Sequence, residues 1–480
     1  MDQRLHAPPL LMFAPEKPSC TEMTSITPNV EAARRIPDDY QADMDLAAKY
    51  ACSGPRYTSY PTAPQFRADF PLAQYLAWQD KDGDHKRAPL SLYVHLPFCH
   101  DICYYCACNK IVTRKKGVAR RYLDHLEREI EQQASLVGDG RPVTQMHWGG
   151  GTPTYLDDAE LTELMHTLAS HFRLLDKGYR EYSIEVDPRT VQQPTIALLK
   201  GVGFNRVSLG IQDFDPLVQQ AVNRIQPYEQ IATLVDSIRT HEFRSLSFDL
   251  IYGLPQQDRF TMQETLRKVI SLRPDRIACY NYAHLPERFA SQRFIDRMTL
   301  PEPGEKLLLQ QIISHTLQDA GYLHIGMDHY VLPQDELALA QSEGRLQRNF
   351  QGYSLRMADD LLGLGVSAIS QIGDFYLQNE RNLDSYYSLI EAGSLPANRG
   401  CRVTRDDKLR RHIIMTLISD LRLDIAECNQ QFGIDFDATF RDQLAALQPL
   451  AQDGLLRIAR GEIRITDRGR PFLRNICMPF

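Results

Sequence analysis

The chain has 480 residues, and its 54 basic against 61 acidic side chains give a formal net charge of −7. That length allows two or three domains with sizeable cores, while the acidic balance gives no general attraction to nucleic acid. Four of the 10 cysteines gather between positions 99 and 108 and the others are scattered, a pattern typical of a reducing compartment and not of a disulfide framework.

Residues 1–48 are predicted to form a disordered extension, because they are rich in Pro, Ser, Thr and charge and show no hydrophobic period. Leu10–Phe13 is too short for a signal peptide, and acidic residues such as Glu16 argue against a transit peptide. No apolar run reaches the length of a bilayer span, so the sequence predicts a cytoplasmic protein without a membrane partner. A second segment, 49–89, contains Gly54–Thr62, a turn-rich aromatic stretch whose simplest interpretation is a surface linker.

Between 90 and 380 the chain alternates predicted strands and helices. Apolar runs bounded by turn residues indicate strands, and the helical period of 122–136, 157–172 and 261–272 indicates helices. Repeated strand–helix units imply parallel strands in an α/β barrel or part-barrel, in which chemistry lies at the carboxyl ends of the strands. The six predicted strands are Leu90–Phe98, Gln145–Trp148, Tyr182–Val186, Arg206–Ile211, Leu246–Tyr252 and Arg276–Asn281.

A cysteine-rich loop follows the first of these strands. Cys99, Cys103 and Cys106 have the spacing C-x3-C-x2-C, and Cys108 comes two residues later. Closely spaced thiolates are the usual ligands of iron–sulfur clusters. Three ligands leave one iron of a cubane cluster open to a small molecule, in the way that a catalytic zinc keeps an open position. Structural zinc ligation and buried thiols are the alternatives, and Cys108 is interpreted as a neighbour of the cluster and not as its fourth ligand.

Polar residues stand near the end of each predicted strand, where a packed core would have apolar ones. Tyr93 and His95 lie two residues apart on the first strand and therefore share a face. The second strand ends in consecutive glycines, which permit close backbone approach. A carboxylate such as Glu185 inside a barrel is costly unless it meets a cation or a donor. Each feature has an alternative interpretation. His95 could be a hydrogen-bonded core residue, the glycines could form a plain tight turn, and Arg224 on a later helix could form a surface ion pair.

After the last predicted strand, the sequence predicts a helix over 304–320, a further strand over 322–330 and a Gly-rich loop over 362–370. Residues 381–480 are assigned to a mostly helical C-terminal domain, with helices over 406–421 and 437–450 and a hairpin over 454–465. Helices followed by a hairpin suit a winged-helix module. Its basic residues are interspersed with acidic ones, so no basic stripe forms and no nucleic-acid partner is expected.

The cysteine loop with its flanks, YVHLPFCHDICYYCACNK, resembles the radical S-adenosylmethionine (SAM) enzymes and, more specifically, the oxygen-independent coproporphyrinogen III oxidases of haem biosynthesis. GPRYTSYPT, GGGTP and GLGVSAIS are similar to segments of the same family, and the resemblance covers about residues 50–478. It implies an α/β fold, an incomplete (β/α)6, TIM-like radical SAM barrel with a mostly helical, winged-helix-like C-terminal domain. It also implies that GPRYTSYPT lies near the active site.

The resemblance implies the chemistry as well. Cys99, Cys103 and Cys106 would hold a 4Fe–4S cluster whose open iron binds SAM, and two SAM molecules would be bound. A SAM-derived 5′-deoxyadenosyl radical would remove a hydrogen from substrate propionates. Loss of carbon dioxide would then turn two propionates into vinyl groups, so that coproporphyrinogen III becomes protoporphyrinogen IX. The expected partner of this monomeric oxidoreductase is a reducing electron donor such as flavodoxin or ferredoxin.

Individual site residues are implied position by position. Tyr93, His95, Glu185 and Arg224 are expected to be catalytic. Tyr105 stands where another aromatic residue is common in the family. The positions expected to contact SAM are Tyr93, Tyr105, Gly150, Gly151, Thr152, Glu185, Gln212, Arg224, Asp249, Ala283 and Ile369.

Two other functions would use the same scaffold. A haem-binding chaperone would bind haem without decarboxylating a substrate, but Cys108 and the GPRYTSYPT segment count against it, because that branch of the family generally lacks them. A cluster-bearing transcriptional regulator would use the C-terminal module to bind DNA in a steeply salt-dependent way. The mixed charge of that module counts against this interpretation.

Overall fold

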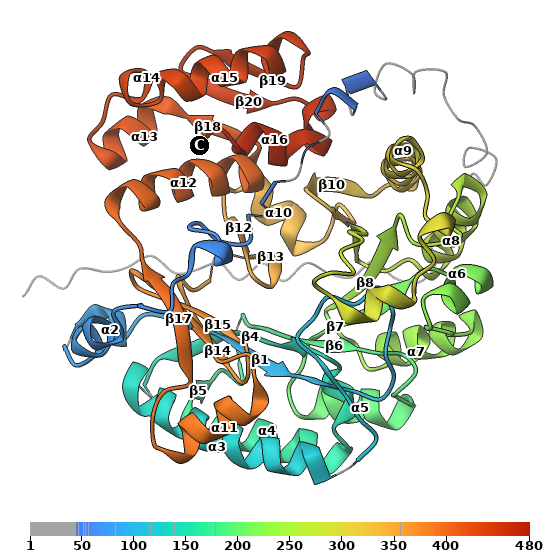
Figure 1. The fold of residues 1–480 in the computed structure, drawn as a ribbon, viewed down its shortest axis with the longest axis vertical. Helices are drawn as coiled ribbons and strands as arrows, with labels where there is room; N and C mark the ends of the chain where they lie inside the picture. Colours follow the sequence, from blue (N-terminus) through green and yellow to red (C-terminus); the bar gives the residue numbers. More distant parts are fainter. Residues whose placement is uncertain are drawn as a thin grey trace, which may run out of the picture.

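The computed structural model describes residues 45–480, apart from positions 47, 51, 53, 56, 82, 116, 139, 178 and 356. The extension predicted over 1–48 therefore falls almost wholly outside the described residues. The described chain forms a large sheet with helices against its outer face, and a smaller domain built from the C-terminal residues lies across one end of it (Figure 1). No helix in the described ranges is long and apolar enough to cross a membrane.

The large sheet contains the six predicted parallel strands as consecutive neighbours, in the order β9-β8-β7-β6-β4-β1. Its register places Tyr93 opposite His147, and His147 opposite Ser183, so these three side chains share one face of the sheet. The repeated strand–helix order thus produced parallel strands, as predicted. The strands are β1 (Leu90–Leu96), β4 (Pro142–Gly150), β6 (Glu181–Val186), β7 (Arg206–Gln212), β8 (Ser245–Tyr252) and β9 (Arg276–Asn281).

Further strands extend both edges of this parallel core without closing it. β14 (Asp360–Leu364) pairs in parallel with β1, and an antiparallel run continues outward from it. β11 pairs with β9 at the other edge. The outermost strands, β10 and β17, do not pair with each other, which confirms the incomplete barrel. The added strands are β10 (Leu323–Gly326), β11 (His329–Val331), β15 (Ile369–Ile372), β16 (Phe375–Asn379) and β17 (Ala397–Arg402), with β5 (Arg173–Leu174) beside β4.

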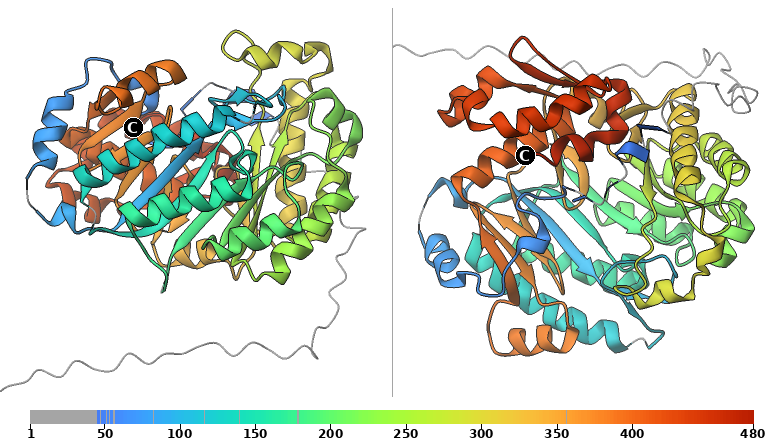
Figure 2. Two further views of the ribbon diagram at one scale, coloured as in Figure 1. Left: turned by 90° about the horizontal axis from the view of Figure 1, so that it is seen from below. Right: turned by 45° about the horizontal axis from the view of Figure 1, so that its top comes forward.

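The helices between the strands bury one stripe each against the sheet. Tyr122, Leu126 and Ile130, spaced four residues apart on α3, are fully buried in the main core. Asp157 caps α4 through a capping box with Glu160, which fixes where that helix begins. Figure 2 shows these helices covering the strands when the molecule is seen from below. They are α3 (Gly117–Val137), α4 (Asp158–His171), α5 (Gln193–Gly201), α6 (Pro216–Ala221), α7 (Tyr228–Thr240), α8 (Arg259–Leu272) and α9 (Pro303–Asp319).

Three local predictions were wrong. The strand predicted over 322–330 is an antiparallel hairpin, because Met327 turns the chain with a φ of 47° between β10 and β11. The loop predicted over 362–370 belongs in part to β14 and β15, and only its centre forms the turn. The helix predicted over 437–450 is broken at Phe440, whose ring is buried in the domain core with non-helical backbone angles.

The C-terminal domain packs around a second hydrophobic core, which it shares with residues such as Ile325 and Leu337. It also has a small sheet of order β18-β20-β19, as expected for a winged-helix-like module. β17 follows the predicted boundary between 380 and 381, but it pairs with β16 inside the large sheet. We propose a boundary at about 403. The domain contains α12 (Arg405–Asp420), β18 (Arg422–Asp424), α13 (Ile425–Phe432), α14 (Phe436–Thr439), α15 (Arg441–Gln452), β19 (Leu456–Ala459), β20 (Glu462–Ile465) and α16 (Leu473–Cys477).

Smaller elements connect the two domains. Tyr57, in the stretch interpreted as a surface linker, is 4 % exposed and belongs to the core of the C-terminal domain, so that interpretation was wrong. Thr58 and Ser59 line a cavity of about 460 Å³ together with residues of α12. The remaining elements are α2 (Leu72–Gln79), β2 (Phe98–Cys99), β3 (Ile111–Val112), α10 (Glu336–Ser342), β12 (Leu346–Asn349), β13 (Gly352–Leu355) and α11 (Leu383–Glu391).

Candidate active site

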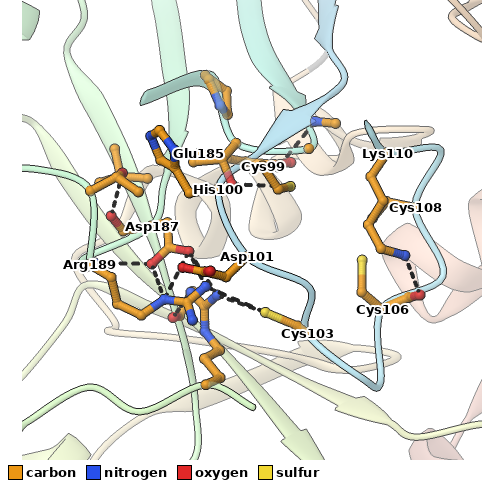
Figure 3. Close-up of a pocket in the computed structure, with 18 of the residues that line it drawn as sticks. Cys99, His100, Asp101, Cys103, Cys106, Cys108, Lys110, Glu185, Asp187 and Arg189 are labelled. Atoms are coloured by element: carbon orange, nitrogen blue, oxygen red, sulfur yellow. Dashed lines mark hydrogen bonds and ion pairs between the residues drawn. The ribbon is translucent and has the colours of Figure 1, made fainter. Parts of the chain in front are cut away.

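A cavity of about 570 Å³ opens where the parallel strands end, on the side of the cysteine loop. This is the edge at which α/β barrels carry their chemistry. In Figure 3 the sulfur atoms of Cys99, Cys103 and Cys106 stand around a common open space. The cavity brings together most of the predicted site residues: Cys99, Cys103, Tyr105, Cys106, Gly150, Gly151, Thr152, Glu185, Gln212, Arg224 and Asp249.

Two guanidinium groups face the sulfur of Cys103. Arg189 Nη2 and Arg224 Nη1 each lie 3.5 Å from Cys103 Sγ. Both arginines also hold Asp187, at 2.7 Å and 3.0 Å. Burial alone would raise the pKa of Asp187, but the two guanidinium groups outweigh it and lower that pKa to about 2. Two cations against one carboxylate leave an excess of positive charge next to the Cys103 sulfur.

The other thiols of the loop differ in their surroundings. Burial raises the pKa of Cys99 to about 11, although Thr152 contacts its sulfur at 3.5 Å. A hydrogen bond with Cys108 lowers the pKa of Cys106 to about 6. Metal ligation needs thiolates, so loading a cluster would release the proton of Cys99. In the described part of the chain no three His, Cys, Asp or Glu side chains converge on one point as a single metal ion requires.

Two glycines at the end of β4 shape the cavity wall next to the thiols. A Cβ on Gly151 would lie 2.6 Å from the backbone of Pro97, and one on Gly150, with a φ of +112°, would lie 2.6 Å from the His95 ring. The cysteine loop and the end of β4 therefore approach more closely than any side chain would allow. Three thiols around one open space, a cationic neighbour and a wall of bare backbone fit an iron–sulfur cluster with a small ligand beside it.

A chain of polar side chains leads from β1 to the cavity. The Tyr93 hydroxyl lies 3.0 Å from His95 Nδ1, and the Tyr93 ring stacks on His147 with centroids 6.0 Å apart. His147 Nε2 lies 3.1 Å from Glu185 Oε1. Burial acts to raise the pKa of Glu185, but the hydrogen bond and charge of His147 outweigh it and lower that pKa. Glu185 is therefore held as an anion at neutral pH.

A second carboxyl on the neighbouring wall behaves in the opposite way. Asp249 receives a hydrogen bond of 3.0 Å from Ser208, which comes from the adjacent strand. Burial, reinforced by the charge of Glu185, raises the pKa of Asp249 to about 7. One carboxyl stays ionised while the other carries a proton part of the time, so the pair offers an acceptor and a donor to one ligand.

Four predicted site residues lie outside the cavity wall. Tyr93 and His95 are one step behind it, in the chain that ends at Glu185. The carbonyl of Ala283 accepts a hydrogen bond from the same Gln292 amide that holds the carbonyl of Tyr105. Ile369 packs against a separate small cluster that includes Tyr376. The structure does not place Ile369 in contact with the cavity.

The turn before Ile369 is fixed by a buried carboxyl. Glu129 on α3 accepts hydrogen bonds from Gly365 N at 2.8 Å, Asn379 Nδ2 at 2.7 Å and the Tyr386 hydroxyl at 2.6 Å. Two turns earlier on the same face of α3, the Tyr122 hydroxyl accepts from Val366 N and donates to the carbonyl of His95. The helix α3 therefore ties this turn to the strand that carries Tyr93 and His95.

Because Glu129 is fully buried, its pKa is raised to about 7. A raised folded-state pKa adds stability that is complete below the unfolded value and is lost as pH rises through about 7. We expect the Glu129→Gln variant to lack this loss, which for the native carboxyl amounts to about 3 kcal/mol between pH ~4.5 and ~7. Melting temperatures measured across that range check this, with the exposed Glu163→Gln as the control. Parallel curves for wild type and Glu129→Gln would contradict it.

Sequence reasoning missed three residues of the site. His147 lies in the predicted strand Gln145–Trp148 without an expected role, and Asp187 and Arg189 are not among the predicted site residues. A signal existed for His147, because it shares a strand face with Tyr93 across the β1–β4 register. No pattern in the sequence indicated that Arg189 would turn back onto Asp187, two residues before it.

Comparison with known proteins agrees with this geometry. Residues 93–269 match the Radical SAM superfamily and residues 403–472 match the HemN C-terminal domain. The chain is 49 % identical to the oxygen-independent coproporphyrinogen III oxidase of Pseudomonas aeruginosa, over 92 % of this chain and 96 % of that protein. The Escherichia coli K12 protein of the same name is 48 % identical, over 92 % and 95 %.

A solved structure shares the whole architecture. Coproporphyrinogen III oxidase (HemN) from Escherichia coli, described as a radical SAM enzyme, superposes with a TM-score of 0.85 at 47 % identity, covering 88 % of this chain and 96 % of that one. One solved relative therefore matches both the barrel and the C-terminal domain of this chain. The chain belongs to the oxygen-independent coproporphyrinogen III oxidase family of radical SAM enzymes.

Proposed function

We propose that this chain catalyses the oxygen-independent oxidative decarboxylation of two propionates of coproporphyrinogen III to vinyl groups, giving protoporphyrinogen IX. The observation that carries the proposal is the set of three thiols around one cavity, at the strand ends of the barrel. The similarity to oxygen-independent coproporphyrinogen III oxidases, which extends over nearly their full length, supports it. The superfamily implies a 4Fe–4S cluster and SAM as cofactors. The relatives are named as oxidases, so the haem-chaperone alternative is not favoured.

The cluster is proposed to be held by Cys99, Cys103 and Cys106. When bound, the cluster and SAM supply the radical that abstracts hydrogen from the substrate. Gly150, Gly151 and Thr152 form a wall of backbone and hydroxyl groups next to the thiols, suited to the amino acid part of SAM. Glu185 would accept from an ammonium or a ribose hydroxyl, and Asp249, with its raised pKa, would donate to a ribose oxygen.

The remaining site residues are proposed to orient these ligands. Gln212 and Tyr105 line the same cavity. The Gln212 amide could exchange hydrogen bonds with a sugar, and the Tyr105 ring would lie near the cluster. Ala283 and Ile369 lie outside the cavity wall, so their contacts with SAM would require a ligand that extends beyond it. A second SAM molecule is part of the proposal, and equilibrium dialysis of the reconstituted protein against labelled SAM would give two equivalents per chain if it binds.

Tyr93, His95, Glu185 and Arg224 are proposed as the catalytic set. Tyr93, His95 and Glu185 belong to one polar chain with His147. The hydrogen bonds of this chain restrict the orientation of the side chains at and behind the cavity wall. Arg224 joins the cysteine loop to the end of β6 through Cys103 and Asp187. A flavodoxin or ferredoxin is proposed as the electron donor.

The test is anaerobic reconstitution with iron and sulfide, followed by incubation with coproporphyrinogen III, SAM and a chemical reductant. Protoporphyrinogen IX is the expected product, and alanine at Tyr93, His95, Glu185 or Arg224 is expected to abolish its formation while circular dichroism stays unchanged. Near-normal turnover in all four variants would overturn the residue assignments. Absence of product from the loaded wild-type protein would overturn the function.

A further inference from the structure

Two segments far apart in the sequence hold the cysteine loop between them. Asn223, just after α6, donates a hydrogen bond of 2.7 Å to the carbonyl of Ile102. From the other side, the segment 285–300 contributes Gln292 Nε2, 3.0 Å from the carbonyl of Tyr105, and Ser291 Oγ, 3.1 Å from the carbonyl of Cys106. The loop that carries the thiols is therefore fixed to both segments through its backbone.

The two segments and the loop share a small hydrophobic core. Val218 and Val222 come from α6 and its end, Ile295 comes from 285–300, and all three are buried in one cluster. Tyr104 and Tyr105 of the cysteine loop pack against the same cluster. Loop, α6 and 285–300 thus form one packed unit at the end of the barrel.

The outer side chains of this unit are apolar and exposed. Leu217 is 64 %, Ile225 65 %, Phe294 66 % and Met298 89 % exposed, and we call these four residues the apolar collar. With Leu285 they make up five of the eleven exposed large hydrophobic residues of the described chain. The Phe294 ring stacks on Tyr104, between the ligands Cys103 and Cys106, with centroids 5.1 Å apart. Such a concentration of apolar surface marks an interaction site.

The segment 285–300 has a small excess of positive charge, in a chain that is negative overall. Arg288, Arg293 and Arg297 are exposed and form no ion pair with another described residue. The segment 285–300 also holds two acidic residues, Glu287 and Asp296, and Asp296 caps the backbone N–H of Met298 at 2.9 Å. An apolar centre with an unpaired cationic rim fits a partner whose own surface is acidic.

We propose that the apolar collar is the docking surface for a small acidic one-electron carrier protein. The inference rests on the proposed function, because a reducible cluster behind Tyr104 gives a carrier a reason to dock there. The carrier would give up one electron, be oxidised by one unit, and reduce the cluster by the same unit. The collar is small, in keeping with the limited interfaces of transient electron-transfer complexes.

The test compares two reductants on the loaded enzyme under anaerobic conditions. A collar variant, Phe294→Asp with Met298→Asp, and a rim variant, Arg293→Glu with Arg297→Glu, are assayed for SAM cleavage with reduced flavodoxin, with reduced ferredoxin and with dithionite. We expect at least a tenfold loss of the carrier-supported rate and a change below twofold with dithionite. The rim variant should also lose the salt dependence of the wild-type rate with the carrier. Leu339→Asp, exposed on α10, is the matched control and should leave every rate unchanged.

Equal losses with dithionite and with both carriers would overturn the proposal, because the substitutions would then act on the cluster site itself. Unchanged rates with both carriers would overturn it as well, since docking would take place elsewhere. Failure of the proposed function gives a different result, in which wild-type protein reduced by dithionite forms no protoporphyrinogen IX. The two failures are therefore distinguishable in one set of assays.

Discussion

Replacing Cys103 with serine is expected to remove all detectable protoporphyrinogen IX formation and most of the bound iron. Cys103 is buried, and the guanidinium groups of Arg189 and Arg224 lie 3.5 Å from its sulfur. Thiolates are the usual ligands of iron–sulfur clusters, whereas a serine hydroxyl stays protonated and binds iron poorly. Iron and sulfide content per chain, measured after anaerobic reconstitution together with product formation, gives the result.

The matched control for this variant is Cys401→Ser, which changes a half-buried thiol on β17. It should retain both its iron and its activity. If Cys103→Ser kept a full complement of iron, or if both variants lost it equally, Cys103 would not be a cluster ligand.

Arg224→Met is expected to lower the free energy of unfolding by about 3–5 kcal/mol, the usual result of breaking a buried ion pair from one side. The guanidinium is only 7 % exposed, lies 3.0 Å from Asp187 and donates a hydrogen bond of 2.6 Å to the carbonyl of Gly210. Methionine keeps an unbranched apolar stem and removes both interactions. We also expect at least a hundredfold loss of kcat/KM, because Cys103 and the cavity wall lose a shared anchor.

Urea unfolding and steady-state assays of the loaded protein measure these two effects. Arg189→Met is the matched control, because the Arg189 side chain binds the same carboxylate but is 20 % exposed. Its ion pair with Asp187 is also local, since the two residues are only two positions apart in the sequence. Its loss of stability should be clearly smaller. If the two substitutions lowered the free energy of unfolding and kcat/KM equally, the buried Arg224 ion pair would contribute no more than the Arg189 pair.

Local patterns in the sequence were enough to predict the barrel and to group the three thiols that line its cavity. The six parallel strands are bounded by turn residues and buried along their length, so an apolar run such as 206–211 identifies β7 almost to the residue. Spacing alone grouped Cys99, Cys103 and Cys106, because ligands on one short loop need no knowledge of the rest of the fold. The carboxyl ends of parallel strands meet at one edge, which is why Glu185 and Asp249 could be expected in one site.

What the sequence did not reveal depends on contacts between distant residues. In the sequence Glu129 has the pattern of an ordinary polar position of an amphipathic helix. In the structure it accepts from three donors, which lie in the turn after β14, in β16 and in α11. The sequence around Tyr57 has the pattern of a linker, but the Tyr57 side chain packs in the same hydrophobic cluster as the C-terminal domain. The pairing of β17 with β16 likewise has no signature in one sequence, and it favours a domain boundary about twenty residues later than the predicted one.

The central claim is that three thiols hold a cluster which keeps one position open to SAM. It is tested most directly by the electron paramagnetic resonance spectrum of the reconstituted, dithionite-reduced protein, recorded with and without SAM. We predict a reduced iron–sulfur signal that shifts when SAM is added. A protein that binds zinc in place of iron, or a cluster signal that SAM leaves unchanged, would contradict the account.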